Sequence, residues 1–156
     1  MRAVILMAAL GLCACQPQAP EGQAAAAPDA AGIAVKELTP EEARKIATTD
    51  FNGPMMARGN EPFWAVRMDG TRFTLMRPDH PELAFEAPGA QISPGKGVWP
   101  AKSADGQALT VTLYVSDCND GMSDIAYPFT AEVEFGGETL RGCAAKQAQL
   151  ANEPPR

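Results

Sequence analysis

The chain lacks several features that whole classes of protein require. No run of 18 apolar residues occurs in its 156 residues, so the sequence predicts no membrane-spanning helix. Its 13 basic residues are outnumbered by 19 acidic ones, which disfavours a nucleic-acid partner because phosphate binding needs a basic surface. The length excludes a two-domain enzyme with a separate cofactor-binding fold.

The sequence also contains no familiar catalytic motif. Its single histidine, His80, stands between Asp79 and Pro81 in an expected turn. There is no Gly-x-Ser-x-Gly elbow and no Cys-x-x-Cys pair. These absences favour a non-enzymatic protein with no cofactor. A hydrolase that uses two carboxylates brought together by the fold is a less favoured alternative.

Residues 1–14 have the layout of a bacterial lipoprotein signal peptide. Arg2 supplies a positive charge, residues 3–12 are apolar, and Leu12-Cys13-Ala14-Cys15 matches a lipobox with Cys15 as the lipid-modified residue. Cys13 is disfavoured as that residue because the bulky Leu12 would then precede the cleavage site. Gln16 follows Cys15 in place of an inner-membrane retention Asp, so we expect an outer-membrane lipoprotein that faces the periplasm.

Removal of residues 1–14 and acylation of Cys15 would leave two cysteines, Cys118 and Cys143. Two thiols in an oxidising compartment predict a disulfide. It would close a loop of about 26 residues and stabilise the fold by roughly 3–4 kcal/mol. A free pair used in redox or metal chemistry is the alternative.

The remaining chain divides by composition. Residues 15–38 form an expected disordered tether, because 16–32 are nearly all Ala, Pro, Gln and Gly. A short helix is expected within 39–50, over about 40–48, with Thr39 as N-cap, Pro40 at the first position and Glu42 completing a capping box. Residues 146–156 form an expected flexible polar tail.

Residues 51–145 alternate apolar and polar side chains with the period of β-strands. The alternation predicts six or so strands; the clearest lie around 64–68, 73–75, 109–115, 129–135 and 138–143, and a weak one lies at 82–86. Asp69-Gly70 and Gly136-Gly137 predict hairpin turns, the first of type I′. Residues 88–100 are expected to form a loop broken by Gly and Pro, continued to 106 by polar linkage. The pattern predicts an antiparallel meander curled into a small barrel or sandwich.

The segment 58–64 is a first candidate for function. Gly59-Asn60 favours a turn, Pro62 is expected to begin a strand, and Phe63 and Trp64 are expected to enter the core. One interpretation is a turn that fixes the fold, with Arg58 and Glu61 as an ion pair. The other is a polar rim around an aromatic-lined barrel mouth, in which the candidate binding residues are Arg58, Asn60, Glu61 and Trp64.

The second candidate is the acidic segment 117–124, followed by Tyr127 and Pro128. Clustered carboxylates suit calcium, but the register fails, since Gly121 falls at position 5 and Pro128 at position 12 of an EF-hand loop. A connection whose Asp and Asn side chains satisfy turn amides fits better. Candidate binding residues here are Asp117, Asn119, Asp120, Asp124 and Tyr127.

A copper site is a third hypothesis. Met55, Met56, Met122 and His80 are soft ligands of the kind that copper prefers. Methionines are more often core residues, and these four do not form the dense Met-x-x-Met runs of copper carriers. The sequence therefore predicts no metal site.

Three motifs together resemble a known family. They are RGNEPFW at 58–64, DCNDGMSD at 117–124 with Tyr127-Pro128, and GGETLRGCA at the end of the β-rich region. The set resembles a family of uncharacterised proteobacterial envelope lipoproteins over about 54–145. The resemblance implies a small β-rich periplasmic domain in which Cys118 and Cys143 match the family's paired cysteines. Some members are joined to domains that resemble lysozyme inhibitors, whose own Ser- and Tyr-containing signature this chain lacks.

These observations predict a lipid-anchored binding module of the cell envelope. Its most concrete form is an inhibitor of a lysozyme-like muramidase, because loss of Arg2 takes the net charge from −6 to −7 and lysozymes are basic. A cell-wall component is another candidate partner. The alternative function is carriage of a small ligand or metal in the barrel mouth.

Overall fold

The computed structural model describes residues 38–151. The expected signal peptide, Cys15 and almost all of the tether lie outside the described residues, as does 152–156. The elements are α1 (Pro40–Thr48), β1 (Met55–Asn60), β2 (Phe63–Asp69), β3 (Arg72–Met76), β4 (Leu83–Glu86), β5 (Gln91–Ser93), β6 (Lys96–Lys102), β7 (Ala108–Cys118), β8 (Tyr127–Phe135), β9 (Glu138–Lys146) and α2 (Gln147–Leu150).

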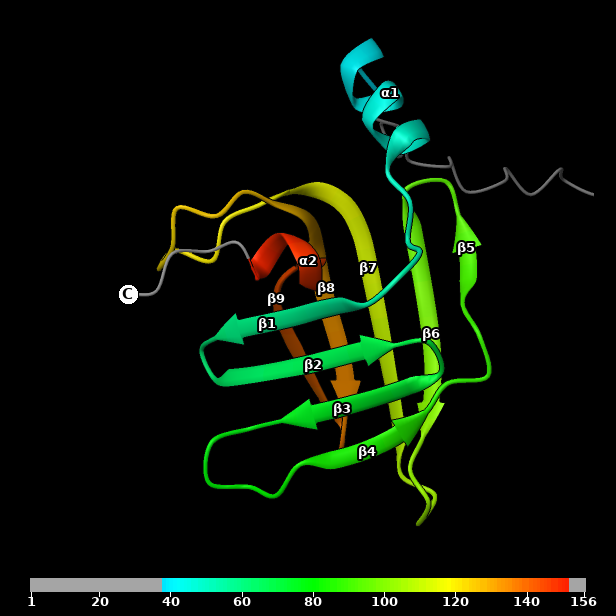
Figure 1. Ribbon diagram of the computed structural model, residues 1–156, viewed down its shortest axis with the longest axis vertical. Helices are drawn as coiled ribbons and strands as arrows, with labels where there is room; N and C mark the ends of the chain where they lie inside the picture. The colour runs from blue at the N-terminus through cyan, green and yellow to red at the C-terminus, as the bar shows by residue number, and fades with distance from the viewer. Residues whose placement is uncertain (1–37, 152–156) are drawn as a thin grey trace, which may run out of the picture. The chain divides into compact units, whose positions relative to one another are not determined.

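The strands form one antiparallel sheet that closes on itself. Its order is β4-β3-β2-β1-β9-β8-β7-β6-β5, and a further pairing of Glu86 in β4 with Lys102 in β6 joins the two ends of the meander. Eight strands therefore form a closed barrel, and β5 is an extra strand paired to β6. In Figure 1, β1–β4 run across β6–β8, so the two halves of the sheet face each other. The expected mainly β meander, preceded by one short helix, is confirmed.

The barrel is filled by the inward-facing residues of the alternating strands. On β7, Leu109, Val111 and Leu113 are buried, while the threonines between them are half-buried on the outer side. The same alternation places Trp64, Val66 and Met68 of β2 inside, as the sequence predicts. A closed barrel leaves few free strand edges, which makes it a stable arrangement for a small β domain.

The helix α1 begins as the sequence predicts. The Thr39 hydroxyl accepts the Glu42 amide, and the Glu42 carboxylate accepts the Thr39 amide, which completes the capping box. No residue of α1 is buried. Its contacts with the barrel include an ion pair between Lys45 and Asp117 and the packing of Ile46 near Gly95.

The segment 58–64 differs from its expected layout. Gly59 and Asn60 belong to β1, and the turn lies at Glu61-Pro62, whose peptide bond is cis. Position 59 of this strand requires a glycine because the Trp64 indole packs directly over it. A Cβ at this position would lie 2.3 Å from the indole nitrogen. Only Trp64 is core, because Phe63 faces outward with 56% of its surface exposed.

Two further expectations are corrected. Most of residues 88–100 is not a loop, since 91–93 and 96–100 belong to β5 and β6 and Pro94-Gly95 turns the chain between them; only 88–90 lie outside this hairpin. Pro100 is tolerated in β6 because β5 pairs with β6 only as far as Val98. On the β5 side of the strand, the N–H that Pro100 lacks would therefore have no partner strand. The β2–β3 turn is formed by Gly70 and Thr71, one residue later than expected.

Of these two turn residues only Gly70 has a positive φ, of 59°, which is typical of type II′ and not of type I′. The turn at Gly136-Gly137 is found where predicted, with both residues at positive φ. Residues 146–150, expected in the tail, form the end of β9 and helix α2.

Candidate functional site

Arg58, Asp120 and Tyr127 form a polar network on the outer side of β1 and β8. The Arg58 guanidinium donates to the Tyr127 hydroxyl through Nε at 2.7 Å and also through Nη2. The hydroxyl in turn donates to Asp120 Oδ2 at 2.7 Å, and Arg58 Nη2 lies 3.7 Å from the same oxygen. The two sequence motifs are thus brought together by a tyrosine that links their charged groups.

The loop between β7 and β8 is folded around Asp120. Its Oδ1 accepts the amides of Met122 at 3.0 Å and Ser123 at 2.7 Å, and the Ser123 hydroxyl lies within 2.9 Å of both carboxylate oxygens. The Asn119 side chain accepts the Gly121 amide at 2.7 Å. These are the turn-satisfying roles that the sequence indicates for Asp and Asn.

A disulfide fixes the start of the same loop. Cys118 and Cys143 are bonded with their Cα atoms 5.6 Å apart, so the expected disulfide is confirmed. Cys143, Tyr127 and Ala145 form a small buried cluster, against which Ile125 and Leu150 pack. The loop is therefore held by a covalent bond, a polar network and apolar packing at once.

The network shifts the pKa values of its two acids in opposite directions. Burial alone would raise the pKa of Asp120, but hydrogen bonds from Tyr127, Met122 and Ser123 outweigh it and hold the pKa well below its usual range. Burial raises the pKa of the Tyr127 phenol, and its hydrogen bond to the Asp120 carboxylate adds to that effect. At neutral pH the network therefore contains a carboxylate, a neutral phenol and a guanidinium, whose charges balance.

The other predicted binding residues have separate positions. Asn60 donates its side-chain amide to the Asp120 backbone carbonyl at 2.5 Å, which ties β1 to the loop. Glu61 is exposed in the β1–β2 turn. Trp64 is 3% exposed inside the barrel, and its indole N–H has no hydrogen-bond partner among the described residues. Asp117 and Asp124 are exposed, and Asp117 pairs with Lys45.

The residues considered for metals do not gather in one place. Met55 is buried in the barrel, Met56 is half-buried, and Met122 and His80 are exposed. Within residues 38–151 no group of three His, Cys, Asp or Glu side chains is arranged to hold a metal ion. The Asp120 carboxylate, which a calcium loop would use, accepts protein donors on both oxygens.

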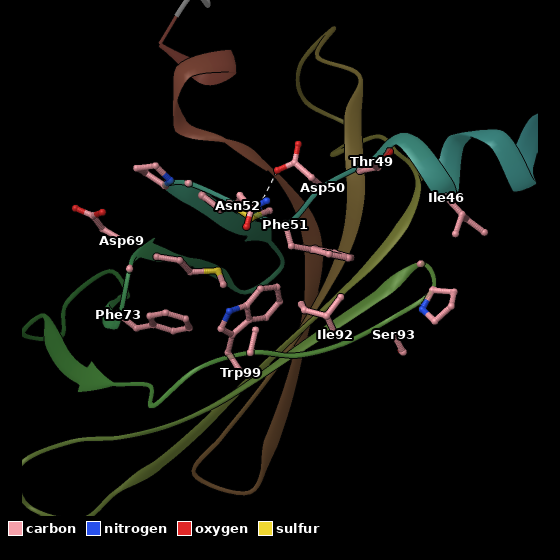
Figure 2. A pocket seen from close by; sticks show the side chains of 18 residues that line it. Ile46, Thr49, Asp50, Phe51, Asn52, Asp69, Phe73, Ile92, Ser93 and Trp99 are labelled. Atoms are coloured by element: carbon pink, nitrogen blue, oxygen red, sulfur yellow. Dashed lines mark hydrogen bonds between the residues drawn. The ribbon is translucent and has the colours of Figure 1, made fainter.

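An apolar cleft that the sequence did not indicate opens at one end of the barrel. Its volume is about 810 Å³, within the range of small-molecule sites. The buried side chains Met55, Met68, Phe73 and Trp99 line it from inside the barrel. Figure 2 shows Phe51, Ile92 and Trp99 gathered on one side of this cleft, with Phe73 on another.

Aromatic packing builds one wall of the cleft. Phe51, in the segment between α1 and β1, places its ring 5.8 Å from that of Trp99 and 5.3 Å from that of Phe129. Trp99 and the Ile92 side chain both lie against Gly97, where a Cβ would come within 2.5 Å of the indole and 3.1 Å of Ile92. Gly97 thus lets the indole lie flat against β6.

The polar groups of the cleft stand at its rim. Asp50 receives two hydrogen bonds from Lys146, at 2.8 and 2.9 Å, and a third from the Asn52 amide. The hydrogen bond from Lys146, helped by the one from Asn52, lowers the pKa of Asp50. Asp69, at the end of β2, lies opposite Arg72 of β3, but its side chain forms no ion pair or hydrogen bond with any described residue. Among residues 38–151, no Lys, Arg or His lines the cleft.

Sequence reasoning missed this cleft because its walls come from segments far apart in the chain. Near Trp64, where the sequence suggested an aromatic-lined mouth, the structure has a separate and smaller cleft of about 280 Å³, which Arg58, Asn60 and Trp64 help to line; Glu61 does not line it, and the cleft at Trp99 is a different one. Comparison with known proteins finds no matching family model, no matching curated sequence and no matching solved structure. Neither helix within 38–151 has the length and apolar content needed to cross a bilayer.

Proposed function

We propose that this chain is a lipid-anchored, non-enzymatic binding module of the bacterial envelope, and that its ligand is a small, largely apolar molecule held in the cleft at the barrel mouth. The lipobox at Cys15 supports the anchor and the location. The single observation that carries the ligand proposal is the cleft itself, which is open to solvent, has a volume of about 810 Å³ and has buried Met, Phe and Trp side chains among its lining residues.

The exposed Ile92 strengthens the argument. This residue is apolar but 56% exposed. It belongs to the short strand β5 and lies beside Trp99 of the neighbouring strand β6 (Figure 2). Covering its side chain together with the aromatic wall would remove apolar surface from water, and fully burying one side chain of this size contributes about 1.5–3 kcal/mol. Because Ile92 is only 56% exposed, a ligand that covers it would gain about half of this energy.

The proposal is tested with a neutral fluorescent probe, N-phenyl-1-naphthylamine, whose emission rises in apolar surroundings. The protein is residues 15–156 carrying Cys15→Ser, which cannot be acylated and so needs no detergent that would compete for the cleft. We expect saturable binding at one site and an affinity about tenfold lower for Ile92→Asp.

Phe63→Asp is the matched control, because Phe63 is equally exposed but does not line the cleft. It should bind the probe as the parent protein does. No saturable binding to the parent protein, or equal losses in the two variants, would contradict the proposal.

A protein partner at the β7–β8 loop is a second candidate, supported by the rigidity of that loop. The loop exposes Met122 and Asp124 on a backbone fixed by the disulfide and the Asp120 network, and a preorganised loop loses little entropy on binding. A basic lysozyme is the concrete partner. A lysozyme clearance assay with added protein tests this, and an unchanged lytic rate at micromolar excess would refute it.

A further inference from the structure

The charges around the cleft specify the class of its ligand beyond apolarity. Within the described part of the chain, two acidic residues, Asp50 and Asp69, stand at the rim, and no basic residue lines the cleft. Lys146 neutralises Asp50 through two hydrogen bonds, so its charge is offset within the protein. Asp69 has no such partner among the described residues, and its charge faces solvent at the rim.

We infer that the cleft binds an amphiphile whose apolar part lies against Trp99 and Phe51 and whose head group is cationic, with Asp69 as the residue that recognises the charge. This rests on the proposed function and adds the ligand's charge to it. An anionic head group at the same rim would face Asp69 with like charge, and the nearby Lys146 already binds Asp50. A neutral head group would bind through apolar contact alone.

Different residues supply the apolar contacts and the charge of the proposed site. The apolar part of the site is built from side chains inside the barrel and from Phe51 and Ile92. The charge comes from the exposed end of β2, where Asp69 precedes the Gly70-Thr71 turn. Removing the charge should therefore leave the apolar site and the fold intact.

Three probes with the same ten-carbon chain test the inference: decyltrimethylammonium, decanol and decyl sulfate, each below its micelle concentration. Their affinities for residues 15–156 with Cys15→Ser are measured by displacement of N-phenyl-1-naphthylamine. We expect decyltrimethylammonium to bind about threefold more tightly than decanol at low salt, the size of an exposed charge pair, and decyl sulfate to bind most weakly. The preference for the cation should shrink in 0.5 M salt.

Asp69→Asn should abolish the preference for decyltrimethylammonium and leave decanol binding unchanged. Asp124→Asn is the matched control, because Asp124 is an exposed acid that does not line the cleft, and it should preserve the preference. Equal affinities for all three probes, or tighter binding of decyl sulfate, would overturn the inference while leaving an apolar cleft as the ligand site. Failure of every probe to bind would overturn the proposed function as well.

Discussion

Asp120→Asn gives the sharpest test of how the two sequence motifs are joined. The variant keeps the shape of the side chain, and its carbonyl oxygen can still accept the Met122 and Ser123 amides. The amide nitrogen that replaces Oδ2 cannot accept the Tyr127 hydroxyl, whose bond to Asp120 is 2.7 Å long. It also places a donor where the Arg58 guanidinium now faces a carboxylate oxygen at 3.7 Å.

The size of the effect follows from these lost contacts. A hydrogen bond to a charged group contributes about 1.5–3 kcal/mol, and the Asp120 side chain is only 6% exposed, so solvent replaces little of it. We expect the free energy of unfolding at pH 7 to fall by about 2–3 kcal/mol. Urea denaturation with the disulfide intact measures this difference.

The pH dependence gives the prediction a second signature. The pKa of Asp120 in the folded protein lies below its ordinary value of 3.8, so the charged form stabilises the fold above about pH 4. That stabilisation is lost as the pH falls from 3.8 towards the folded-state pKa. The difference between parent and variant should therefore shrink below pH 4, with a slope approaching about 1.4 kcal/mol per pH unit.

A matched control lies three residues away. Asp117 is exposed and pairs with Lys45 at the surface, so Asp117→Asn should change the stability much less. A loss for Asp120→Asn that stayed constant from pH 7 to pH 2.5 would refute the assigned charge. A loss no larger than that of Asp117→Asn would refute the structural role of the network.

Three further outcomes follow from the structure. Replacing both Cys118 and Cys143 with serine should lower the free energy of unfolding by roughly 3–4 kcal/mol, measured by urea denaturation, and an unchanged value would contradict the loop-closure argument. Gly142→Ala should destabilise the barrel strongly, because the new Cβ would lie 2.0 Å from the Arg58 carbonyl oxygen. A melting temperature equal to that of Thr139→Ala, an exposed position on the same strand, would refute this. In a Tyr114→Phe background, which leaves one tyrosine, the Tyr127 phenol should ionise only above its ordinary pKa of 10, since burial raises that pKa; a phenolate signal that appears near 10 on alkaline titration would contradict that environment.

Much of the fold could be predicted from residue patterns because most strands face the core on one side only. The alternation at 64–68, 109–115 and 129–135 corresponds to the buried faces of β2, β7 and β8. β5 and β6 were missed because proline and glycine dominate their region. The turn at Pro94-Gly95 and the one-sided pairing of Pro100 accommodate these residues. Both features depend on how the strands pair, which the local sequence does not show.

The candidate site could be predicted only in part. The sequence selected Arg58, Asp120 and Tyr127, and the structure brings them within hydrogen-bonding distance, but it uses them to hold the β7–β8 loop. Their polar atoms bind one another, which a sequence cannot reveal. The cleft escaped prediction because Phe51 and Trp99 are ordinary core residue types, and only closure of the barrel places them side by side.

The chain's two tryptophans provide the most direct test of the central claim, that the cleft at the barrel mouth is the ligand site. Trp99 lines the cleft, whereas Trp64 lies inside the barrel and does not line it. Titration with N-phenyl-1-naphthylamine is followed through the two indole N–H signals in a ¹H–¹⁵N spectrum, assigned with Trp99→Phe. We predict that the Trp99 signal shifts with saturation while the Trp64 signal stays in place. A shift of the Trp64 signal alone, or of neither signal, would contradict the account.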